Sequence, residues 1–173
     1  MLKQQATAGF FKYTLSFDDM LLVPKFSDVN SRSEIDLTSK IGDLTFELPI
    51  ISSPMDTVTE LKMAYSMHTN GGLGIIHRYN SIGEQAKIVK DSQVGEAVVG
   101  AAIGVTGDYQ ERARELVNSG AQVLCVDVAH GHHILVKEAL SKLRAEFGND
   151  LCVIAGNVAT LQGINDLADW GAD

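Results

Sequence analysis

Five short apolar runs, evenly spaced along the chain, are the sequence feature that most limits the possible folds. Their first residues lie about 24 to 29 positions apart, which is the length of one strand-and-helix unit. Val123–Val126 is apolar on both alternating faces, as expected of a strand covered on both sides in a parallel sheet. A helix must then return the chain after each strand. The runs are Leu48–Ser52, Gly72–Ile76, Ala97–Ala102, Gln122–Asp127 and Leu151–Ala155.

The segments between these runs have the apolar periodicity of amphipathic helices. Between Asp108 and Gly120, the apolar residues Ala113, Leu116 and Val117 share one face. The segment from Ile134 to Phe147 has a similar face. Its apolar stripe is expected at Leu135, Ala139, Leu143 and Phe147, with Val136 and Leu140 bordering it.

Local signals mark where these helices start and stop. Thr57–Glu60 and Ser81–Glu84 both fit the capping-box pattern, in which a hydroxyl and a carboxylate satisfy amides of the first helical turn. Gly120, Gly148 and Gly171 stand where helix ends favour a residue with positive φ. We therefore expect strands and helices to alternate.

The fold class that this alternation indicates is α/β, as a partial TIM (β/α)8 barrel with about five of its eight units. The barrel is expected to occupy residues 48–173, after an N-terminal arm at residues 1–47. Apolar pieces of the arm at Met20–Val23 and Ile35–Leu37 fit a small strand pair or a cap across the barrel floor. Trp170–Asp173 is typical of a turn that ends a helix and leads into a further strand, so closing the ring would need about three more units.

Composition and charge exclude several classes of protein. A chain of 173 residues, 45% of them hydrophobic, suits one domain with a sizeable core. A net charge of −8, with Lys and Arg scattered singly, argues against a nucleic-acid-binding surface. No apolar run reaches the length of a membrane span or follows the pattern of a signal peptide. We therefore expect a soluble, cytoplasmic protein without membrane or nucleic-acid partners.

The two cysteines, Cys125 and Cys152, both fall within apolar runs. Two cysteines give no disulfide framework and suit a reducing compartment. We expect both thiols to be buried with raised pKa values, and therefore to be poor nucleophiles.

Chemistry in a barrel of this type belongs to the loops that follow the strands. Five such loops are rich in glycine, hydroxyl, amide or imidazole groups, which can approach a polar ligand closely. They are Ser53–Thr57, His77–Asn80, Ile103–Asp108, Val128–His133 and Gly156–Thr160.

Three histidines, His130, His132 and His133, stand together in one of these loops. Zinc needs three or four converging ligands with partners that orient them. Side chains of adjacent residues tend to diverge, so we expect no metal site here. No glycine-rich dinucleotide fingerprint follows any of the expected strands.

Five motifs in sequence order resemble the IMP dehydrogenase and GMP reductase family, over about residues 14 to 173. They are Phe17–Lys25, Ser52–Glu60, Gly71–Arg78, Asp127–His132 and Ala155–Thr160. The resemblance implies a TIM barrel that oxidises IMP to XMP with NAD, a potassium-type monovalent cation site and a homotetramer. It also implies a nucleophilic cysteine in a loop expected beyond Asp173, so no catalytic residue is assigned within the chain.

The resemblance also implies roles for individual residues. Ser53, Met55 and Asn157 are expected to contact the IMP substrate. The cofactor NAD is expected to lie against the residues Thr106, Asp127, Val128 and Ala129. The potassium-type cation is expected to bind outside this chain.

Two members of the family compete as the interpretation. Most motifs resemble IMP dehydrogenase, whereas the sequence of Asp127–Ala129 is closer to that of GMP reductase. Only Asp91–Val99 fills the position where most IMP dehydrogenases carry two regulatory CBS modules, so we expect none here. We favour IMP dehydrogenase, with GMP reductase second and a non-catalytic nucleotide-binding fragment as a further alternative. The isolated chain is expected to be inactive, and poorly stable or oligomeric, because open strand edges template self-association.

Overall fold

A computed structural model describes residues 16–173 except 94 and 96, and the chain divides into two units between Asp36 and Leu37. The second unit contains five parallel strands whose order in the sheet follows their order in the sequence. This succession confirms the expected series of strand-and-helix units. The strands are β3 (Ile51–Ser52), β4 (Leu73–Ile76), β5 (Val99–Ile103), β6 (Val123–Asp127) and β7 (Cys152–Gly156).

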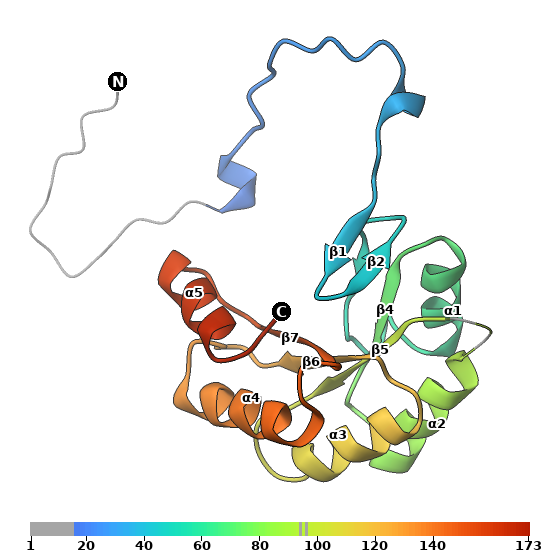
Figure 1. The fold of residues 1–173 in the computed structure, drawn as a ribbon, viewed down its shortest axis with the longest axis vertical. Helices are drawn as coiled ribbons and strands as arrows, with labels where there is room; N and C mark the ends of the chain where they lie inside the picture. The colour runs from blue at the N-terminus through green and yellow to red at the C-terminus, as the bar shows by residue number, and fades with distance from the viewer. Residues whose placement is uncertain (1–15, 94, 96) are drawn as a thin grey trace, which may run out of the picture. The chain divides into compact units, whose positions relative to one another are not determined.

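Five helices cover the outer face of this curled sheet, one after each strand (Figure 1). They make it a half-barrel, and the remaining units of a full TIM barrel stay a prediction. The helices are α1 (Leu61–Thr69), α2 (Ile82–Ser92), α3 (Tyr109–Asn118), α4 (Ile134–Phe147) and α5 (Leu161–Asp169).

The register of the strands assigns their side chains to two faces. Pairing of Val123 with Cys152, and of Cys125 with Ile154, places these four residues on the inner face of the curl. Leu124 and Val153 alternate with them and are buried beneath the helices. The main core therefore lies between sheet and helices, and a smaller one lies inside the curl.

A two-stranded antiparallel hairpin, β1 (Ser39–Ile41) and β2 (Leu44–Phe46), covers the inner face near the start of the strands. Phe46 is 6% exposed and belongs to the same cluster as Leu73, Val123 and Cys152. The strand pair at the starts of the parallel strands is thus formed by residues 39–46, and it belongs to the second unit. The expectation that Met20–Val23 and Ile35–Leu37 form it is wrong, because neither segment is a strand.

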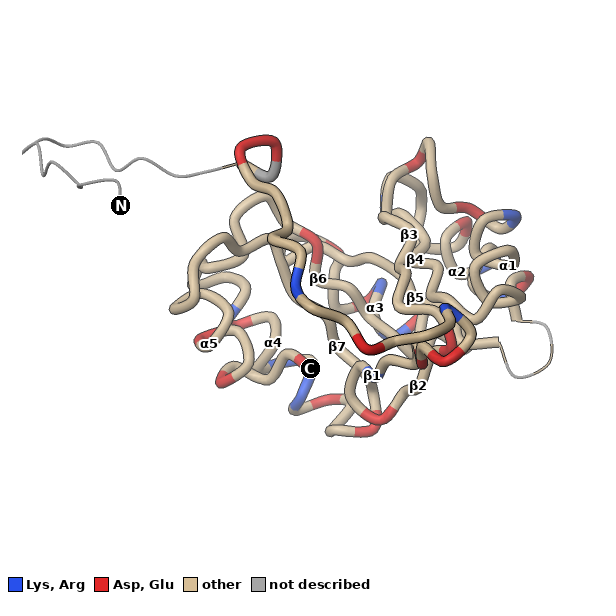
Figure 2. The backbone as a smooth tube through the Cα atoms, turned by 90° about the horizontal axis from the view of Figure 1, so that it is seen from above, with Lys and Arg blue, Asp and Glu red and all other residues tan. Residues whose placement is uncertain are grey.

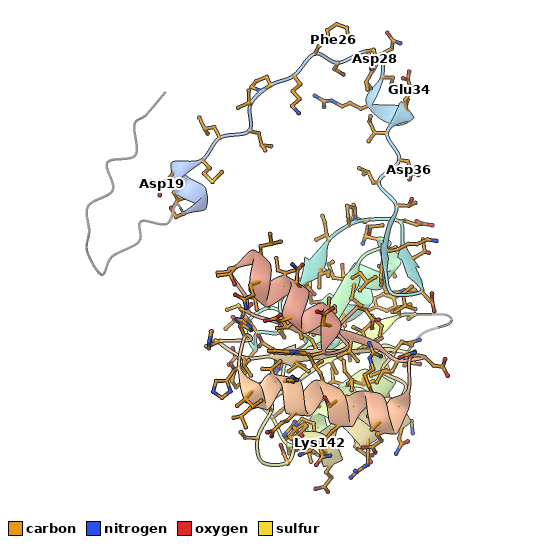
Figure 3. All side chains as sticks on the ribbon, turned by 60° about the vertical axis from the view of Figure 1, so that its left-hand side comes forward. Asp19, Phe26, Asp28, Glu34, Asp36 and Lys142 are labelled. Carbon is orange, nitrogen blue, oxygen red and sulfur yellow. The ribbon has the colours of Figure 1, made fainter. Side chains whose placement is uncertain are left out.

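The first unit has two short 3-10 helices within its described part, Phe17–Asp19 and Arg32–Glu34. From Met20 onward, its described large apolar side chains are exposed, including Leu22 at 98% and Phe26 at 96%. Figure 3 shows the Phe26 ring projecting from the ribbon. The N-terminal residues Met1–Gln5, on which the signal-peptide expectation depends, lie outside the described residues.

One of the two expected capping boxes is present. Ser81 Oγ accepts from the Glu84 amide at 3.2 Å, and the Glu84 carboxylate accepts from the Ser81 amide at 3.0 Å. The prediction of a capping box at Thr57–Glu60 is wrong, since α1 begins only at Leu61 and its N-cap residue Glu60 makes no side-chain capping hydrogen bond.

The apolar stripe of α4 also differs from the expected one. The buried residues are Val136, Ala139, Leu140 and Leu143. Leu135 is 38% exposed. The face in contact with the sheet therefore keeps Ala139 and Leu143 of the expected stripe, takes in its border residues Val136 and Leu140, and leaves Leu135 out.

The chain ends against the edge of β7. Gly171 has a φ of +107°, which turns the chain out of α5, and the Asp173 amide then donates to the Val153 carbonyl at 2.8 Å. This confirms that Trp170–Asp173 is a turn that ends a helix, and the strand expected after it stays a prediction. Beside it, an apolar groove of about 300 Å³ separates the two open edges of the sheet. Its lining includes Ile41, Ile51, Ile154, Ile164 and Leu167.

The charges of the described residues are dispersed. Figure 2 shows Lys and Arg on several separate elements, interspersed with Asp and Glu. Among the described helices, none is long and apolar enough to span a membrane.

Candidate functional site

The loops that follow β6 and β7 are joined by main-chain hydrogen bonds at the carboxyl edge of the sheet. The Val128 amide donates to the Gly156 carbonyl at 3.0 Å, and the Asn157 amide donates to the Val128 carbonyl at 2.7 Å. The Asn157 side-chain amide donates to the same Val128 oxygen at 3.1 Å. We call the loops at this carboxyl edge of the sheet the rim. Main-chain hydrogen bonds fix the rim where the expected substrate residue Asn157 meets the expected cofactor residue Val128.

Gly131 completes this connection because it donates its amide to the Asn157 carbonyl at 2.7 Å. A Cβ at position 131 would lie 2.9 Å from the Gly156 carbonyl carbon. Real Cβ atoms do not approach a backbone so closely, so only glycine allows the two loops to meet here.

Asp127 ends β6 on the inner face, since it pairs in register with Gly156 and alternates with Cys125. It is partly exposed. Within residues 16–173, apart from the two undescribed positions, no hydrogen bond or ion pair holds its carboxylate. Its two carboxylate oxygens are thus free acceptors at the carboxyl end of β6, which suits the recognition of hydroxyl groups.

Arg78 lies at the candidate site, and the sequence reasoning gave it no role of its own. Its Nη2 donates to the Asp127 main-chain oxygen at 3.4 Å, and its guanidinium lies 5.5 Å from the centre of the Tyr79 ring. Its Nε is buried without a partner, and no carboxylate pairs with it in the described part of the chain. The sequence signals that contained it were the His77–Asn80 loop and the Gly71–Arg78 motif.

His77 fixes the loop in which Arg78 lies. It is 3% exposed, its Nδ1 accepts from the Tyr79 amide at 3.1 Å, and its Nε2 lies 3.2 Å from Glu60 Oε1. Because Nδ1 accepts, the ring proton of the neutral form belongs on Nε2, which donates to the Glu60 carboxylate. His77 therefore joins the end of β4 to the start of α1.

The expected substrate residues Ser53 and Met55 lie on an exposed loop after β3. Buried Thr59 folds this loop back, because its hydroxyl donates to the Ser53 carbonyl at 2.6 Å and lies 2.9 Å from Ser52 Oγ. The Met55 amide also donates to the Ser53 carbonyl, at 2.8 Å. Both side chains remain exposed and available to a ligand, Met55 at 51%.

The other expected cofactor residues are placed differently from one another. Thr106 and Ala129 are exposed on the loops after β5 and β6. Val128 is partly buried and packs against the core beneath the helices. A ligand at the rim would therefore meet the main chain of Val128. In the strand order, β4, β5 and β6 lie between the Ser53 loop and the Asn157 loop.

The three histidines have separate partners. His133 is the N-cap of α4 and accepts from the Leu135 amide at 3.1 Å. His132 Nε2 lies 2.7 Å from Asp166 Oδ2 on α5. The rings of His130 and His133 lie 6.4 Å apart with an edge-on orientation. The hydrogen bonds of His132 and His133 therefore connect this loop to α5 and to the start of α4.

Both cysteines are buried, as the sequence predicted. Burial, assisted by the nearby Asp127 carboxylate, raises the pKa of Cys125 to about 12. Burial, with a smaller effect from Asp173, raises the pKa of Cys152 to about 11, while Arg144 acts in the opposite direction. Neither thiol is suited to act as a nucleophile near neutral pH.

Known proteins are similar to this chain over most of its length. An inosine-5'-monophosphate dehydrogenase of Nitrosopumilus maritimus (strain SCM1) is 29% identical over 288 residues, covering 94% of this chain and 60% of the relative. A GMP reductase of Mycoplasma mycoides subsp. mycoides SC is 32% identical over 159 residues, covering 91% and 49%. An inosine-5'-monophosphate dehydrogenase of Cryptosporidium parvum is 34% identical over 203 residues, covering 92% and 50%.

The chain therefore spans about half the length of the curated relatives that it matches. These relatives are named as dehydrogenases and reductases, which are oxidoreductases. A family model described as the IMP dehydrogenase / GMP reductase domain matches residues 14–173. Because this match covers almost the whole sequence, the chain belongs to the IMP dehydrogenase / GMP reductase family.

Proposed function

We propose that this chain is the nucleotide-binding half of an NAD-dependent IMP dehydrogenase, which oxidises IMP to XMP. The observation that carries the proposal is the Asp127 carboxylate, which faces the rim without a protein partner beside the fixed Val128–Asn157 connection. A free carboxylate at the end of a parallel strand can accept hydrogen bonds from ribose hydroxyls. NAD, when bound, would supply the hydride acceptor.

The remaining residues fit this arrangement. Asn157 keeps its side-chain oxygen free while its nitrogen is bound to Val128, so it can accept from a ligand without moving. Ser53 offers a hydroxyl for the phosphate or ribose of IMP, and Met55 offers a polarisable thioether for the face of the purine. Thr106 would contact the adenosine side of the cofactor.

GMP reductase is the second candidate, and the lengths of the aligned segments favour it. The GMP reductase alignment needs only 159 residues to cover 91% of this chain. The alignment with the Nitrosopumilus dehydrogenase runs over 288 residues, more than this chain contains, so that relative has insertions absent here. In this alternative the same rim would hold GMP and NADPH.

Activity should be tested on the polypeptide read from the complete coding sequence. The proposal predicts NAD-dependent formation of XMP from IMP, measured as NADH absorbance. NADPH-dependent conversion of GMP to IMP and ammonia would instead establish the alternative. The 173-residue chain alone should bind nucleotide without turnover, because its two thiols stay protonated. Asp127→Asn should weaken NAD binding about tenfold, the expected cost of losing charge-assisted hydrogen bonds.

A further inference from the structure

A buried polar network lies behind the loop that joins β5 to α3, on the outer side of the sheet. It consists of Gln85 on α2, Arg112 on α3 and Asp108, the N-cap residue of α3. Gln85 is 0% exposed and Arg112 is 8% exposed. A buried guanidinium is costly to desolvate unless its donors are paired, so its partners indicate its role.

Gln85 anchors the network to the sheet. Its amide nitrogen donates to the Ala102 carbonyl of β5 at 2.8 Å and to the Ile76 carbonyl at the end of β4 at 3.4 Å. Its amide oxygen accepts from Arg112 Nη1 at 2.7 Å. The guanidinium is therefore fixed relative to the carboxyl ends of two neighbouring strands.

Arg112 connects this anchor to the loop. Its Nη2 donates to Asp108 Oδ2 at 3.0 Å. Aspartate at an N-cap usually accepts from amides of the first helical turn. The Asp108 carboxylate makes no such bond, and it faces Arg112 instead. The last residue of the loop is thus held by a buried side chain.

We propose that Gln85 and Arg112 are positioning residues that hold the Gly104–Asp108 loop, with Thr106, in the geometry that binds the dinucleotide. This inference rests on the proposed function, which assigns Thr106 to the cofactor. A network that served packing alone could be replaced by apolar side chains of similar volume without a selective effect on the loop.

The test compares two arginines of the same helix. Arg112→Met removes the buried guanidinium, whereas Arg114→Met removes an exposed one that pairs with Glu146. Amide hydrogen exchange of the purified chain is followed by mass spectrometry. Arg112→Met should accelerate exchange in residues 104–108 by about tenfold or more and leave α4 nearly unchanged. Arg114→Met should leave the loop as it is.

A second variant keeps the test decisive if Arg112→Met does not fold. Asp108→Ala removes the loop's end of the network at a side chain that is 50% exposed, and it should produce the same loop-selective acceleration. Arg112→Lys should restore part of the protection. Unchanged exchange in residues 104–108, or acceleration spread evenly over all helices, would overturn the proposal.

Binding measurements separate this inference from the function on which it rests. By calorimetry, Arg112→Met should weaken NAD binding about tenfold and IMP binding less than about twofold. Equal losses for both ligands would contradict a role specific to the cofactor loop. If the unmodified chain binds no NAD but the loop-selective exchange effect appears, the proposed function fails and the positioning role of the network stands.

Discussion

The outer and inner faces of the parallel sheet are packed in different ways, although the same five strands form both. On the outer face, Leu124, Val126 and Val153 are almost completely buried against the helices. On the inner face, Phe46 of the hairpin covers the starts of the strands, and Cys125 lies in the middle of β6. Toward the carboxyl edge the inner face becomes partly exposed at Asp127.

The difference shows how stability and binding are separated within one sheet. The outer face supplies a continuous core, since buried apolar area is the dominant favourable term in folding. The inner face is closed at one end by the hairpin and presents polar groups at the other. The two faces can therefore be perturbed separately.

The largest expected effect concerns the inner-face thiols. Burial raises the pKa values of Cys125 and Cys152 from an ordinary 9.0 to about 12 and about 11, so both remain protonated at pH 8. Alkylation by iodoacetamide should be about 100- to 1,000-fold slower than for free cysteine, because the thiolate is the nucleophile. The alkylation rate of both thiols should keep rising with pH above 9, where the alkylation rate of a free thiol reaches its plateau. Rates within tenfold of free cysteine would show that water reaches the inner face.

The next effect compares truncations on the two faces. Leu124→Ala on the outer face should lower the free energy of unfolding by about 2–5 kcal/mol, since it leaves a cavity in a closed core. Ile154→Ala on the partly exposed inner face of β7 should cost about 1–2 kcal/mol, because less buried surface is lost. Urea unfolding measures both. A larger cost for Ile154→Ala would reverse the comparison.

Two strand glycines without positive φ sharpen the comparison further. A Cβ at Gly74, on the outer face, would lie 2.7 Å from Ala64 Cα, whereas a Cβ at Gly156 would meet nothing within 4 Å. Gly74→Ala should therefore destabilise the fold by about 1–3 kcal/mol through overpacking. Gly156→Ala should change its stability by less than about 0.5 kcal/mol. Thermal melts of the two variants should differ clearly, and equal melting temperatures would contradict the assignment of faces.

The smallest expected effect is at the helix starts on the outer side. Ser81→Ala removes a capping box and should cost about 1 kcal/mol. Thr57→Ala should be close to neutral, since Thr57 is exposed and caps no helix. Denaturant midpoints of the two variants provide the measurement. An equal loss of unfolding free energy for Thr57→Ala and Ser81→Ala would contradict the absence of a capping box at Thr57.

The strands could be predicted from sequence because both of their faces are buried. A run such as Val123–Val126 must be apolar at every position if helices cover one side and the inner core the other. Gly120 and Gly148 were equally informative, since their positive φ values are required locally.

The errors arose where tertiary packing overrode a local pattern. Thr59 is buried against Ser52 and Ser53, which keeps residues 57–60 out of the helix although their sequence matches a capping box. In α4, contact with the sheet buries the border residues Val136 and Leu140 together with the expected Ala139 and Leu143. It leaves Leu135 exposed, although the stripe that begins at Leu135 is equally regular in sequence.

The candidate site was only partly predictable for a similar reason. Asp127 could be proposed from the sequence because the family resemblance points to it and it ends an expected strand. Arg78 acquires its role from a main-chain oxygen 49 residues away, and Gln85 meets Arg112 across 27 residues. No periodicity or motif marks such pairs before the strands are assembled.

An NMR titration of the isotopically labelled 173-residue chain tests the proposed rim most directly. Addition of IMP should shift the amide signals of Ser53, Met55 and Asn157, and addition of NAD should shift those of Thr106 and Ala129. Shifts confined to the apolar groove between the open sheet edges, or no shifts at either ligand's saturating concentration, would contradict nucleotide binding at the carboxyl ends of the strands.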